Sequence, residues 1–577
     1  MCFTWHGSVR AEQVVNLGAL ALLAPLLERM QVADIIDRHL PPDPQLEFSH
    51  GQVLGLLLAA RLAQPTALVN IASWAERTGA DILWNIPADK LNDDRLGRAL
   101  DAFFDQRHSI QASVAEQVLR TAHLTRACLH FDTTHLVFEG VYEGSQPRPS
   151  DLPLPPDTPS ADFAPAHLTY GYGASNTKLV QAGISAVIDA YGAVPVLGHV
   201  LDGNRNGHPA IAQQFHLLQN YLPPPPNLLM VSDRGTFSAA HVARLYHARC
   251  HVLCSVPWND YRDLFAQHRE RLHWQRASYL SLEQQRRRDT SSSLPQEHYE
   301  LAVVRHQLID PATQQPIPCR VVFVFSTADQ KVCRHTRDQA IAKIRAGLEK
   351  IAASVQRGHP QAQPAAIARR VAKLFGNKSA RHYFRWELVP LTPTEQETLP
   401  APQRGCRRPS YRFVFHFDPA AAEADAVYDG RSALVTTAPL LYSADTLFSQ
   451  FKQQNYIELL HHQWKTPLAV RPVFLKSPKR VEALVCLLQV ALTAYQLLER
   501  LYRRSLPHDA PIYQQRMTSE SLLRQFRVYG LVIARSRVGR VVHATRLTTR
   551  QQNILYQLGF ATPAQILSRT LPHLPFA

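Results

Sequence analysis

The chain lacks the signals of several common enzyme classes. Its 577 residues contain no G-x-S-x-G motif, which would position a serine nucleophile, and no G-x-x-x-x-G-K-[ST] phosphate loop. We therefore expect no use of ATP. Cysteine is scarce, because eight residues are too few for a disulfide framework in a chain of this size. Most of them lie inside apolar runs, which indicates buried thiols in a reducing compartment.

Two of these cysteines allow a second interpretation. Cys250 and Cys254, with His247 and His251 beside them, could be zinc ligands. However, the segment CHVLCSVP alternates as a strand does, so both cysteines share a face with Val252. No second pair of ligands lies nearby in the sequence, and a core strand is the favoured interpretation.

Long apolar runs are also missing. The longest uncharged one, residues 483–498, contains Gln489 and Gln496 and is shorter than the roughly 20 residues that a membrane-spanning helix needs. It predicts a buried core helix. The opening residues MCFTWH show no basic segment leading into an apolar one, so no signal peptide is expected. These features predict a soluble, cytoplasmic protein with no membrane partner.

Acidic residues are outnumbered by basic ones. Lysine and arginine total 62 against 47 aspartates and glutamates, which gives a net charge of +15. Excess positive charge favours a polyanionic partner. By itself the charge leaves nucleic acid and a simple surface bias equally open. The hydrophobic content of 45% excludes a wholly disordered chain.

Five regions follow from the pattern along the chain. Residues 1–123 predict an all-helical domain, which could bind DNA ends, bind a second subunit or simply pack. Residues 124–257 give three strands followed by alternating helix and strand, an α/β pattern around a mixed sheet. The remaining regions are a β-rich insertion with one long helix at 258–428, helices that resume over 429–515, and a basic, helical tail at 516–577. Within the insertion we expect strands at 299–308, 320–325, 380–391 and 411–417 and the helix at 337–357. In the tail, Thr548 is expected to cap a short helix that ends at Gly559.

Two aspartates stand where chemistry is expected. Asp132 lies inside the apolar strand HFDTTHLVF, where a carboxylate is costly unless it is paired or binds a cation. Asp233 directly follows the buried strand LLMVS, and sites of α/β sheets gather at the carboxyl ends of strands. Together they suit a hard cation such as Mg²⁺ or Mn²⁺. The alternatives are a hydrogen-bonded core aspartate and a helix cap for 236–248.

Glu458 is the best candidate for the third carboxylate of a two-metal site. It lies in a predicted helix that begins after Ser443 and runs to about Trp464. Lys465 follows seven residues later, so it shares the face of Glu458 and could hold a phosphate. The alternative is a solvated helix face. The neighbours His461 and His462 are expected on the helix surface.

The order of these pieces resembles the DDE transposases of bacterial insertion sequences, and more closely their "insertion sequence four"-like group, in which a β-rich insertion precedes the glutamate. The segment LNDDRLGRALDAFF (91–104) is similar to the helical N-terminal domain that such proteins often carry. The segments that match in order are FDTT (131–134), VLGHVLDGNRNGHPA (196–210), LLMVSDRG (228–235), YDGRSALVTT (428–437) and FKQQNYIELLHHQWKTPLAVRPVFLKSPKRVEA (451–483).

The resemblance implies an RNase H-like catalytic core interrupted by the insertion. It implies that Asp132, Asp233 and Glu458 hold two Mg²⁺ or Mn²⁺ ions for cleavage and strand transfer at terminal inverted repeats. A homodimer on double-stranded DNA in a bacterial cell follows by analogy, associated with the nucleoid when active. The family motif has Tyr and Arg where this chain has Phe451 and Gln454.

Basic residues around these segments are the predicted DNA contacts, with solvated loops as the alternative for the residues of the insertion. They are Arg286, Arg287, Arg407 and Arg408 in the insertion, and Lys465, Arg471, Lys476, Lys479 and Arg480 at and after the glutamate helix. Because of Phe451 and Gln454, two further functions stay open: a catalytically silent DNA-binding protein derived from a transposase, and an RNase H-like nuclease without strand transfer.

Overall fold

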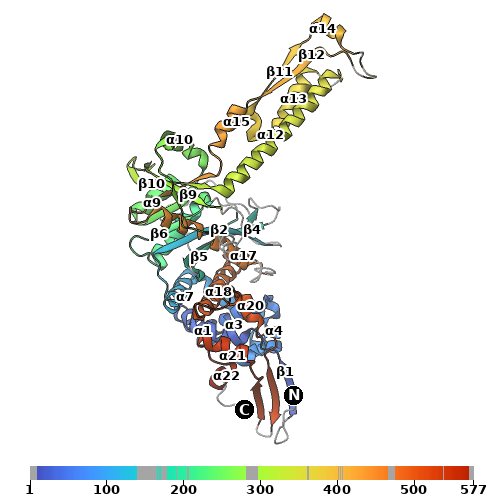
Figure 1. Ribbon diagram of the computed structural model, residues 1–577. Helices are drawn as coiled ribbons and strands as arrows, with labels where there is room; N and C mark the ends of the chain where they lie inside the picture. The colour runs from blue at the N-terminus through green and yellow to red at the C-terminus, as the bar shows by residue number, and fades with distance from the viewer. Residues whose placement is uncertain are drawn as a thin grey trace.

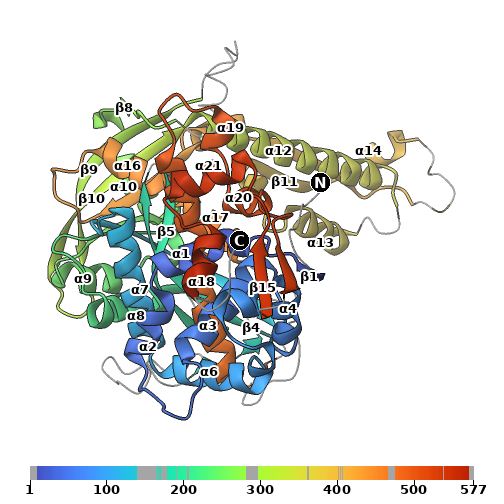
Figure 2. The same cartoon turned by 90° about the horizontal axis from the view of Figure 1, so that it is seen from below.

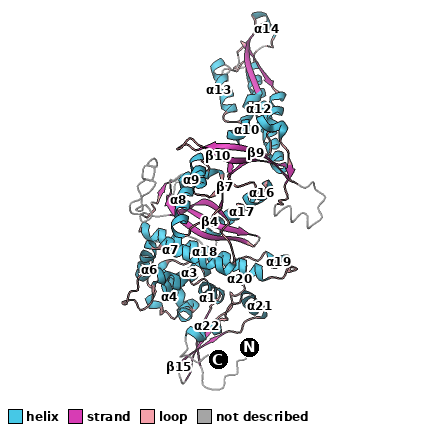
Figure 3. Ribbon diagram, turned by 90° about the vertical axis from the view of Figure 1, so that its left-hand side faces the viewer, coloured by secondary structure: helices cyan, strands magenta, loops and turns pink. Residues whose placement is uncertain are grey.

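An arm projects from one end of the molecule, and the strand β1 (Arg10–Val15) and the helix α22 (Pro563–Thr570) lie at the other end (Figure 1). The structure is a computed structural model. The residues that it describes are 10–138, 165–166, 168–170, 178–189, 191–203, 207–280, 297–359, 363–400, 402, 405, 407–465, 475–536 and 539–570. Between the two ends, helices enclose a large mixed sheet (Figure 3).

The N-terminal region is helical after β1, as the sequence predicts. Asn92 caps α6 by accepting a hydrogen bond from the Arg95 N–H, and Ser49 forms a capping box with Gln52 at the start of α3. The helices are α1 (Leu20–Arg29), α2 (Val32–His39), α3 (His50–Ala63), α4 (Ile71–Thr78), α5 (Ala80–Trp84), α6 (Asp93–Asp105) and α7 (Arg107–Ala122).

Ten strands form the main sheet within the described residues. β5 pairs antiparallel with β4, β4 antiparallel with β2, and β2 runs parallel to β6, which runs parallel to β7. The helices α8 (Gly207–Tyr221) and α9 (Ala239–His247) connect β5 to β6 and β6 to β7. The strands are β2 (Cys128–Phe138), β3 (Thr169–Tyr170), β4 (Lys178–Asp189), β5 (Gly192–Asp202), β6 (Leu229–Ser232) and β7 (His251–Val256).

Helices cover both faces of this sheet. Phe131, Met230 and Cys254 share one hydrophobic cluster with α8, α9 and α10 (Trp258–His268). On the other face, Val231 and Leu253 pack under α16 (Ala444–Lys452). Because side chains alternate along a strand, β2 presents His130, Asp132 and Thr134 to the second face.

Part of the predicted insertion continues the main sheet. β9 (Tyr299–Ile309) and β10 (Pro316–Ser326) pair with each other, β8 (Gln275–Arg276) pairs with β9, and β13 (Arg431–Thr436) joins β10 to β7. The predicted strands 299–308 and 320–325 are therefore confirmed. Their place in the sheet was not predicted, because a local pattern does not specify its partner strand.

The rest of the insertion, residues 327–417, forms the arm (Figure 1). Its long helix α12 (Thr327–Gln356) begins ten residues before the predicted start at 337. Residues 329–336 of α12 are exposed on every side, and the arm has a separate core that includes Ile344, Ile367 and Phe413. The other arm elements are α13 (Pro364–Phe375), β11 (Phe384–Pro390), α14 (Pro393–Thr398) and β12 (Tyr411–Phe417). The chain returns through α15 (Pro419–Ala426).

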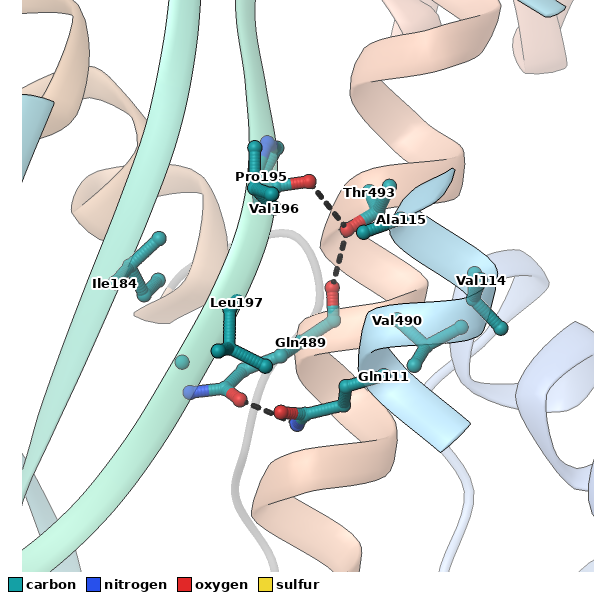
Figure 4. Close-up of a pocket in the computed structure, with 11 residues that line it drawn as sticks. Gln111, Val114, Ala115, Ile184, Pro195, Val196, Leu197, Gln489, Val490 and Thr493 are labelled. Carbon is teal, nitrogen blue, oxygen red and sulfur yellow. Dashed lines mark hydrogen bonds between the residues drawn. The ribbon is translucent and has the colours of Figure 1, made fainter. Parts of the chain in front are cut away.

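The predicted core helix is confirmed as α18 (Pro478–Ser505), in which positions 481–500 are all buried. It is long and apolar enough to cross a membrane, but the apolar part lies entirely inside the protein. Its buried polar side chains each bond a different neighbour. Gln489 bonds Gln111 of α7, and Thr493 donates to the carbonyl of Pro195 in β5 (Figure 4). Glu482 accepts hydrogen bonds from Arg107 and from the Ala166 N–H.

The two ends of the chain meet in a second sheet. β1 pairs with β14 (Leu531–Ser536), which pairs with β15 (Gly539–Ala544). The prediction of a helical tail and an all-helical front was wrong at these strands. The pairing of β1 with β14 spans almost the whole chain and leaves no local signal, whereas β14 and β15 are neighbours in the chain and pair as a local hairpin that the sequence interpretation missed. The tail helices are α19 (Ile512–Gln515), α20 (Ser519–Arg524), α21 (Thr549–Leu558) and α22, and the predicted Thr548 cap and Gly559 stop of α21 are confirmed.

The Arg107–Glu482 ion pair gives a stability prediction. Both side chains are buried, at 4% and 3% exposure, and their atoms lie 2.8 Å apart. Arg107→Met leaves the Glu482 carboxylate buried without its counterion, so the free energy of unfolding in urea should fall by about 3–5 kcal/mol. The control Arg98→Met breaks an exposed pair with Asp94 and should cost less than about 1 kcal/mol. Equal losses in the two variants would contradict a structural role for the buried pair.

Candidate functional site

Asp132 and Asp233 lie at the same level of two neighbouring parallel strands. Phe131 of β2 pairs with Ser232 of β6, so the next residue along each chain segment is the aspartate. Asp132 accepts a hydrogen bond from the Thr133 N–H at 2.8 Å. Asp233 accepts hydrogen bonds from the Arg234 N–H and from the Ser255 hydroxyl of β7. Asp233 therefore follows the carboxyl end of β6, as the sequence predicts, whereas Asp132 lies within β2, which continues to Phe138.

Asp233 does not cap α9. Ser238 does so, by accepting a hydrogen bond from the His241 N–H. Asp233 is exposed and is instead the N-cap of a single turn of 3₁₀-helix, Arg234–Thr236. Its carboxylate is therefore held beside the end of β6.

The predicted helix from Ser443 to Trp464 is two helices. Ser443 caps α16, which ends at Lys452, and α17 (Asn455–Lys465) carries Glu458. At the break, the buried Gln454 amide donates to the carbonyl of Phe131 at 2.9 Å and accepts from His130 Nδ1 at 3.0 Å. Since both partners belong to β2, Gln454 fixes the start of α17 directly beside Asp132.

His130 is neutral in this contact. It is fully buried, and burial lowers its pKa to about 4, against which the hydrogen bonds with Gln454 and Gln450 act. Because the Gln454 N–H group already donates to the strand, its oxygen faces the ring, which places the ring proton on Nδ1. Phe451, the other departure from the family motif, packs partly buried against the cluster of Val231 and Leu253.

The charges of the three carboxylates reach one another. The pKa of Asp132 is raised to about 7, mainly by burial, with the charges of Asp233 and Glu458 contributing in the same direction. The Thr133 N–H and the Lys465 ammonium act in the opposite direction. Asp132, Asp233, Glu458 and Lys465 are thus brought to one place, with Asp132 the most enclosed of the three acids.

His461 is a site residue that the sequence interpretation missed. It is buried, with 7% exposure, and its Nδ1 lies 3.7 Å from Asp132 Oδ2, so the prediction of a surface position was wrong for His461, although His462 is exposed. Burial lowers its pKa to about 4, and the charge of Lys465 lowers it further. Its spacing of three residues from Glu458 was the available signal.

The carboxylates are not drawn together into a closed metal centre. Within the described part of the chain, no three His, Cys, Asp or Glu side chains are arranged to hold a metal ion. Glu458 and Asp233 are exposed, and Glu458 has no ion pair to a described residue that would restrain its rotamer. The three acids supply the oxygen donors that a hard cation prefers, so the donor chemistry fits Mg²⁺ or Mn²⁺.

The predicted basic contacts divide into three groups. Arg286, Arg287 and Arg471 lie outside the described residues. Lys465, Lys476, Arg407 and Arg408 are exposed, and the Arg408 side chain donates to the Gln396 carbonyl.

Lys479 and Arg480 instead face α6. Lys479 pairs with Asp105 at 2.9 Å, and Arg480 pairs with Asp101 through two nitrogens. These two basic residues thus form ion pairs that join α18 to the N-terminal region. The sequence prediction that both residues contact DNA did not take these acidic partners into account, because the partners lie more than 370 positions away in the chain.

Four free cysteines are buried, as expected for core thiols: Cys254 and Cys319 in strands, Cys486 in α18, and Cys250 directly before β7. Cys250, Val252 and Cys254 belong to the same hydrophobic cluster. The core-strand interpretation of CHVLCSVP is therefore confirmed. Cys333, on α12, is exposed.

Comparison with known families gives one match. Residues 12–113 match a family described as a domain of unknown function, DUF4277. The match covers the helices α1 to α6 and the first turns of α7. No similar protein is found among curated sequences.

The Asp132 carboxyl predicts a pH-dependent stability. Its folded pKa of about 7 lies above the unfolded value of about 3.9, so between those values the folded state keeps a proton that the unfolded state has released. The unfolding free energy therefore falls as the pH rises through this window. Asp132→Asn removes this pH-dependent loss. At pH 8 in EDTA, the unfolding free energy of the variant should therefore exceed that of the unmutated protein by about 2–4 kcal/mol. At pH 4 the unfolding free energies of the two proteins should be equal. If their unfolding free energies change in parallel between pH 4 and pH 8, the raised pKa of Asp132 is contradicted.

Gln454 gives a second stability prediction. Gln454→Leu leaves the buried His130 N–H and the Phe131 carbonyl without partners, and each unsatisfied group costs about 1–3 kcal/mol. Urea denaturation should show a loss of about 2–4 kcal/mol. His462→Gln, on the exposed face of the same helix, should change stability by less than about 0.5 kcal/mol. If Gln454→Leu leaves the stability unchanged, contacts other than those of Gln454 hold α17 in place.

Proposed function

We propose that this protein is a DNA transposase that cleaves and joins DNA by metal-assisted phosphoryl transfer. The observation that carries the proposal is the position of Asp132 inside an apolar strand, at the level where β6 ends in Asp233, with the charges of Asp233 and Glu458 near enough to contribute to its raised pKa. The Asp132 carboxylate is enclosed, which is unfavourable unless it is protonated, paired or bound to a cation. The three acids and Lys465 suit chemistry in which a cation and a phosphate share the site.

The sheet supports an RNase H-like core. The strands β5, β4, β2, β6 and β7 lie side by side in that order, antiparallel up to β2 and parallel afterwards, with α8 and α9 as crossovers. This is the arrangement expected of such a core, with the first acid on its central strand and the second on the neighbouring one. The third acid then comes from α17, after the insertion.

The proposed cofactor is a pair of Mg²⁺ or Mn²⁺ ions. When bound, such ions supply activation of the attacking oxygen and stabilisation of the leaving oxygen at a DNA phosphodiester. Asp132 is held rigidly on β2, and Asp233 is oriented by Ser255. Glu458 has an exposed side chain on an anchored helix, so it can turn toward the aspartates by a change of rotamer. Lys465 is placed to hold a phosphate oxygen.

The arm is the strongest candidate surface for double-stranded DNA outside the carboxylates. Residues 327–417 contain 17 lysines and arginines against six aspartates and glutamates, a net charge of +11. Arg407 and Arg408 lie in this region and are exposed. Because the arm has its own core, these charges are not needed to hold it against the sheet. A basic extension beside a phosphoryl-transfer site suits a long polyanion.

The N-terminal region fits a structural role better than the binding of DNA ends. Residues 12–122 carry 14 acidic and nine basic residues, a net charge of −5. Domains of the matched family are often found in transposase-like proteins. We propose that the protein acts on terminal inverted repeats as a homodimer on DNA in the cytoplasm of a bacterial cell.

The inward positions of Gln454 and Phe451 favour a second candidate, a catalytically silent DNA-binding protein. Neither side chain is free to contact a DNA phosphate, and the carboxylates are not assembled. Asp132 nevertheless remains a carboxylate enclosed within an apolar strand, which is costly unless it binds a cation. We therefore place cleavage first.

The test is cleavage of DNA that carries the terminal inverted repeats flanking the gene. The purified protein should nick or cut it in Mg²⁺ or Mn²⁺ and leave it intact in EDTA. Asp132→Ala, Asp233→Ala and Glu458→Ala should each abolish cleavage and retain binding in a gel-shift assay, because the acids serve chemistry and not attachment. Glu116→Gln, an exposed acid on α7, is the matched control and should cleave normally.

The outcomes separate the three functions. Binding without cleavage by the unmutated protein, in both metals, would show a silent DNA-binding protein. Cleavage with no joining of a 3′-hydroxyl end to target DNA would show a nuclease. Cleavage that survives Asp132→Ala would overturn the site itself.

A further inference from the structure

The buried ring of His461 lies between the apolar face of α17 and the candidate site. The apolar face belongs to the main hydrophobic cluster and consists of Ile457, Leu460 and Trp464. His461 comes three residues after Glu458, so it stands at the boundary between this face and the face that carries the acid. α17 packs against α18 and against β2 and β5, and Figure 2 shows α17 beside α18 and β5. The ring is therefore held next to the strand that carries Asp132.

The two oxygens of the Asp132 carboxylate have different surroundings. Oδ1 accepts the hydrogen bond from the Thr133 N–H at 2.8 Å. Oδ2 accepts no hydrogen bond within the part of the chain that the structure describes, and His461 Nδ1 lies 3.7 Å from it. This separation is roughly 0.7 Å longer than an ordinary N–H···O hydrogen bond of about 3.0 Å. A small shift of either side chain would make it one.

The surroundings of the ring select the nitrogen that carries its proton. Burial lowers the pKa of His461 to about 4, so the ring is neutral near pH 7 and only one nitrogen is a donor. Nε2 is enclosed and has no hydrogen-bond partner among the described residues. Among buried backbone groups, an N–H without an acceptor is rarer than an acceptor without a donor. The same preference puts the ring proton on Nδ1, which faces Asp132 Oδ2.

A hydrogen bond to Oδ2 would change what the Asp132 carboxylate can do. With a donor on each oxygen, the carboxylate is fixed in orientation, and each oxygen keeps a lone pair for a cation. The second donor also favours the ionised form, which is the form that binds a metal. Hydrogen bonds of this kind to a ligating group are worth about 10- to 100-fold in metal affinity.

We propose that His461 is a positioning residue of the candidate site. Its Nδ1–H group donates to Asp132 Oδ2 and holds the carboxylate in the orientation that binds the divalent cation. The ring is not itself a metal ligand, because the nitrogen that faces the site carries the proton. The inference rests on the proposed function, since it requires a cation at Asp132.

The experiment measures binding of Mn²⁺ to the full chain by titration calorimetry at pH 8, without DNA. His461→Leu and His461→Asn are matched in size and shape, and only the asparagine keeps an N–H donor near the position of Nδ1. His461→Leu should bind Mn²⁺ about 10- to 100-fold more weakly than the unmutated protein, and His461→Asn should remain within about threefold of it. His462→Leu, at the exposed neighbouring position, is the control and should bind normally.

Unfolding by urea in EDTA separates positioning from packing. Both substitutions at position 461 replace a buried ring by a smaller side chain, so they should lower the urea midpoint by similar amounts. The difference in Mn²⁺ affinity between them then reports the hydrogen bond alone. If His461→Leu does not fold, His461→Phe, which refills the volume of the ring without a donor, takes its place in the comparison.

The outcomes distinguish this inference from the proposed function. Equal Mn²⁺ affinities of His461→Leu and the unmutated protein would overturn the positioning role and leave the proposed function standing. Equal losses of affinity in His461→Leu and His461→Asn would also overturn it, because the ring would then act by packing or as a ligand. If the unmutated protein binds no Mn²⁺, or if Asp132→Ala binds it equally well, the proposed metal site and this inference fail together.

Discussion

The burial of residues 481–500 of α18 is the constraint on which the rest of the structure depends. Where a helix is enclosed on every side, its polar side chains need partners inside the protein. Those of α18 reach several surrounding elements: Glu482 reaches α7, Thr493 reaches β5, and Arg500 pairs with Asp189 of β4. Because these bonds have fixed geometry, they set the position of the N-terminal helices on the sheet.

The same helix also holds α17, the helix of the site that carries Glu458, in position. Gln496 of α18 donates to Gln463 of α17, and at the other end of α17 the Gln454 amide bonds β2. The helix that carries Glu458 is thus held at both ends, and Asp132 belongs to the strand that holds one of them. The relative position of these two acids is therefore a property of the core, whereas the orientation of the Glu458 carboxylate is left to solvent and ligand.

Much of this architecture follows from the sequence, since the strands 299–308, 411–417 and 251–256 and the helix α18 have clear periodicity. Asp132 stood out for a physical reason, as a carboxylate inside an apolar strand. Local sequence patterns do not reveal which distant residues or strands will contact one another. The pairing of β1 with β14, the burial of His461 and the ion pair of Arg480 with Asp101 each depend on residues hundreds of positions away. A charged side chain carries no local mark of whether its partner is solvent, a ligand or another helix.

The length of α12 has a consequence for the footprint of one molecule. Thirty helical residues extend about 45 Å, with a rise of about 1.5 Å per residue. A DNA duplex rises about 3.4 Å per base pair along each strand, so the helix matches about 13 base pairs. On the proposed function, a duplex lying along the arm is therefore engaged more than one full turn away from the bond that is cut. Contacts to the DNA backbone at that distance would then help to set the position of the duplex relative to the bond that is cut.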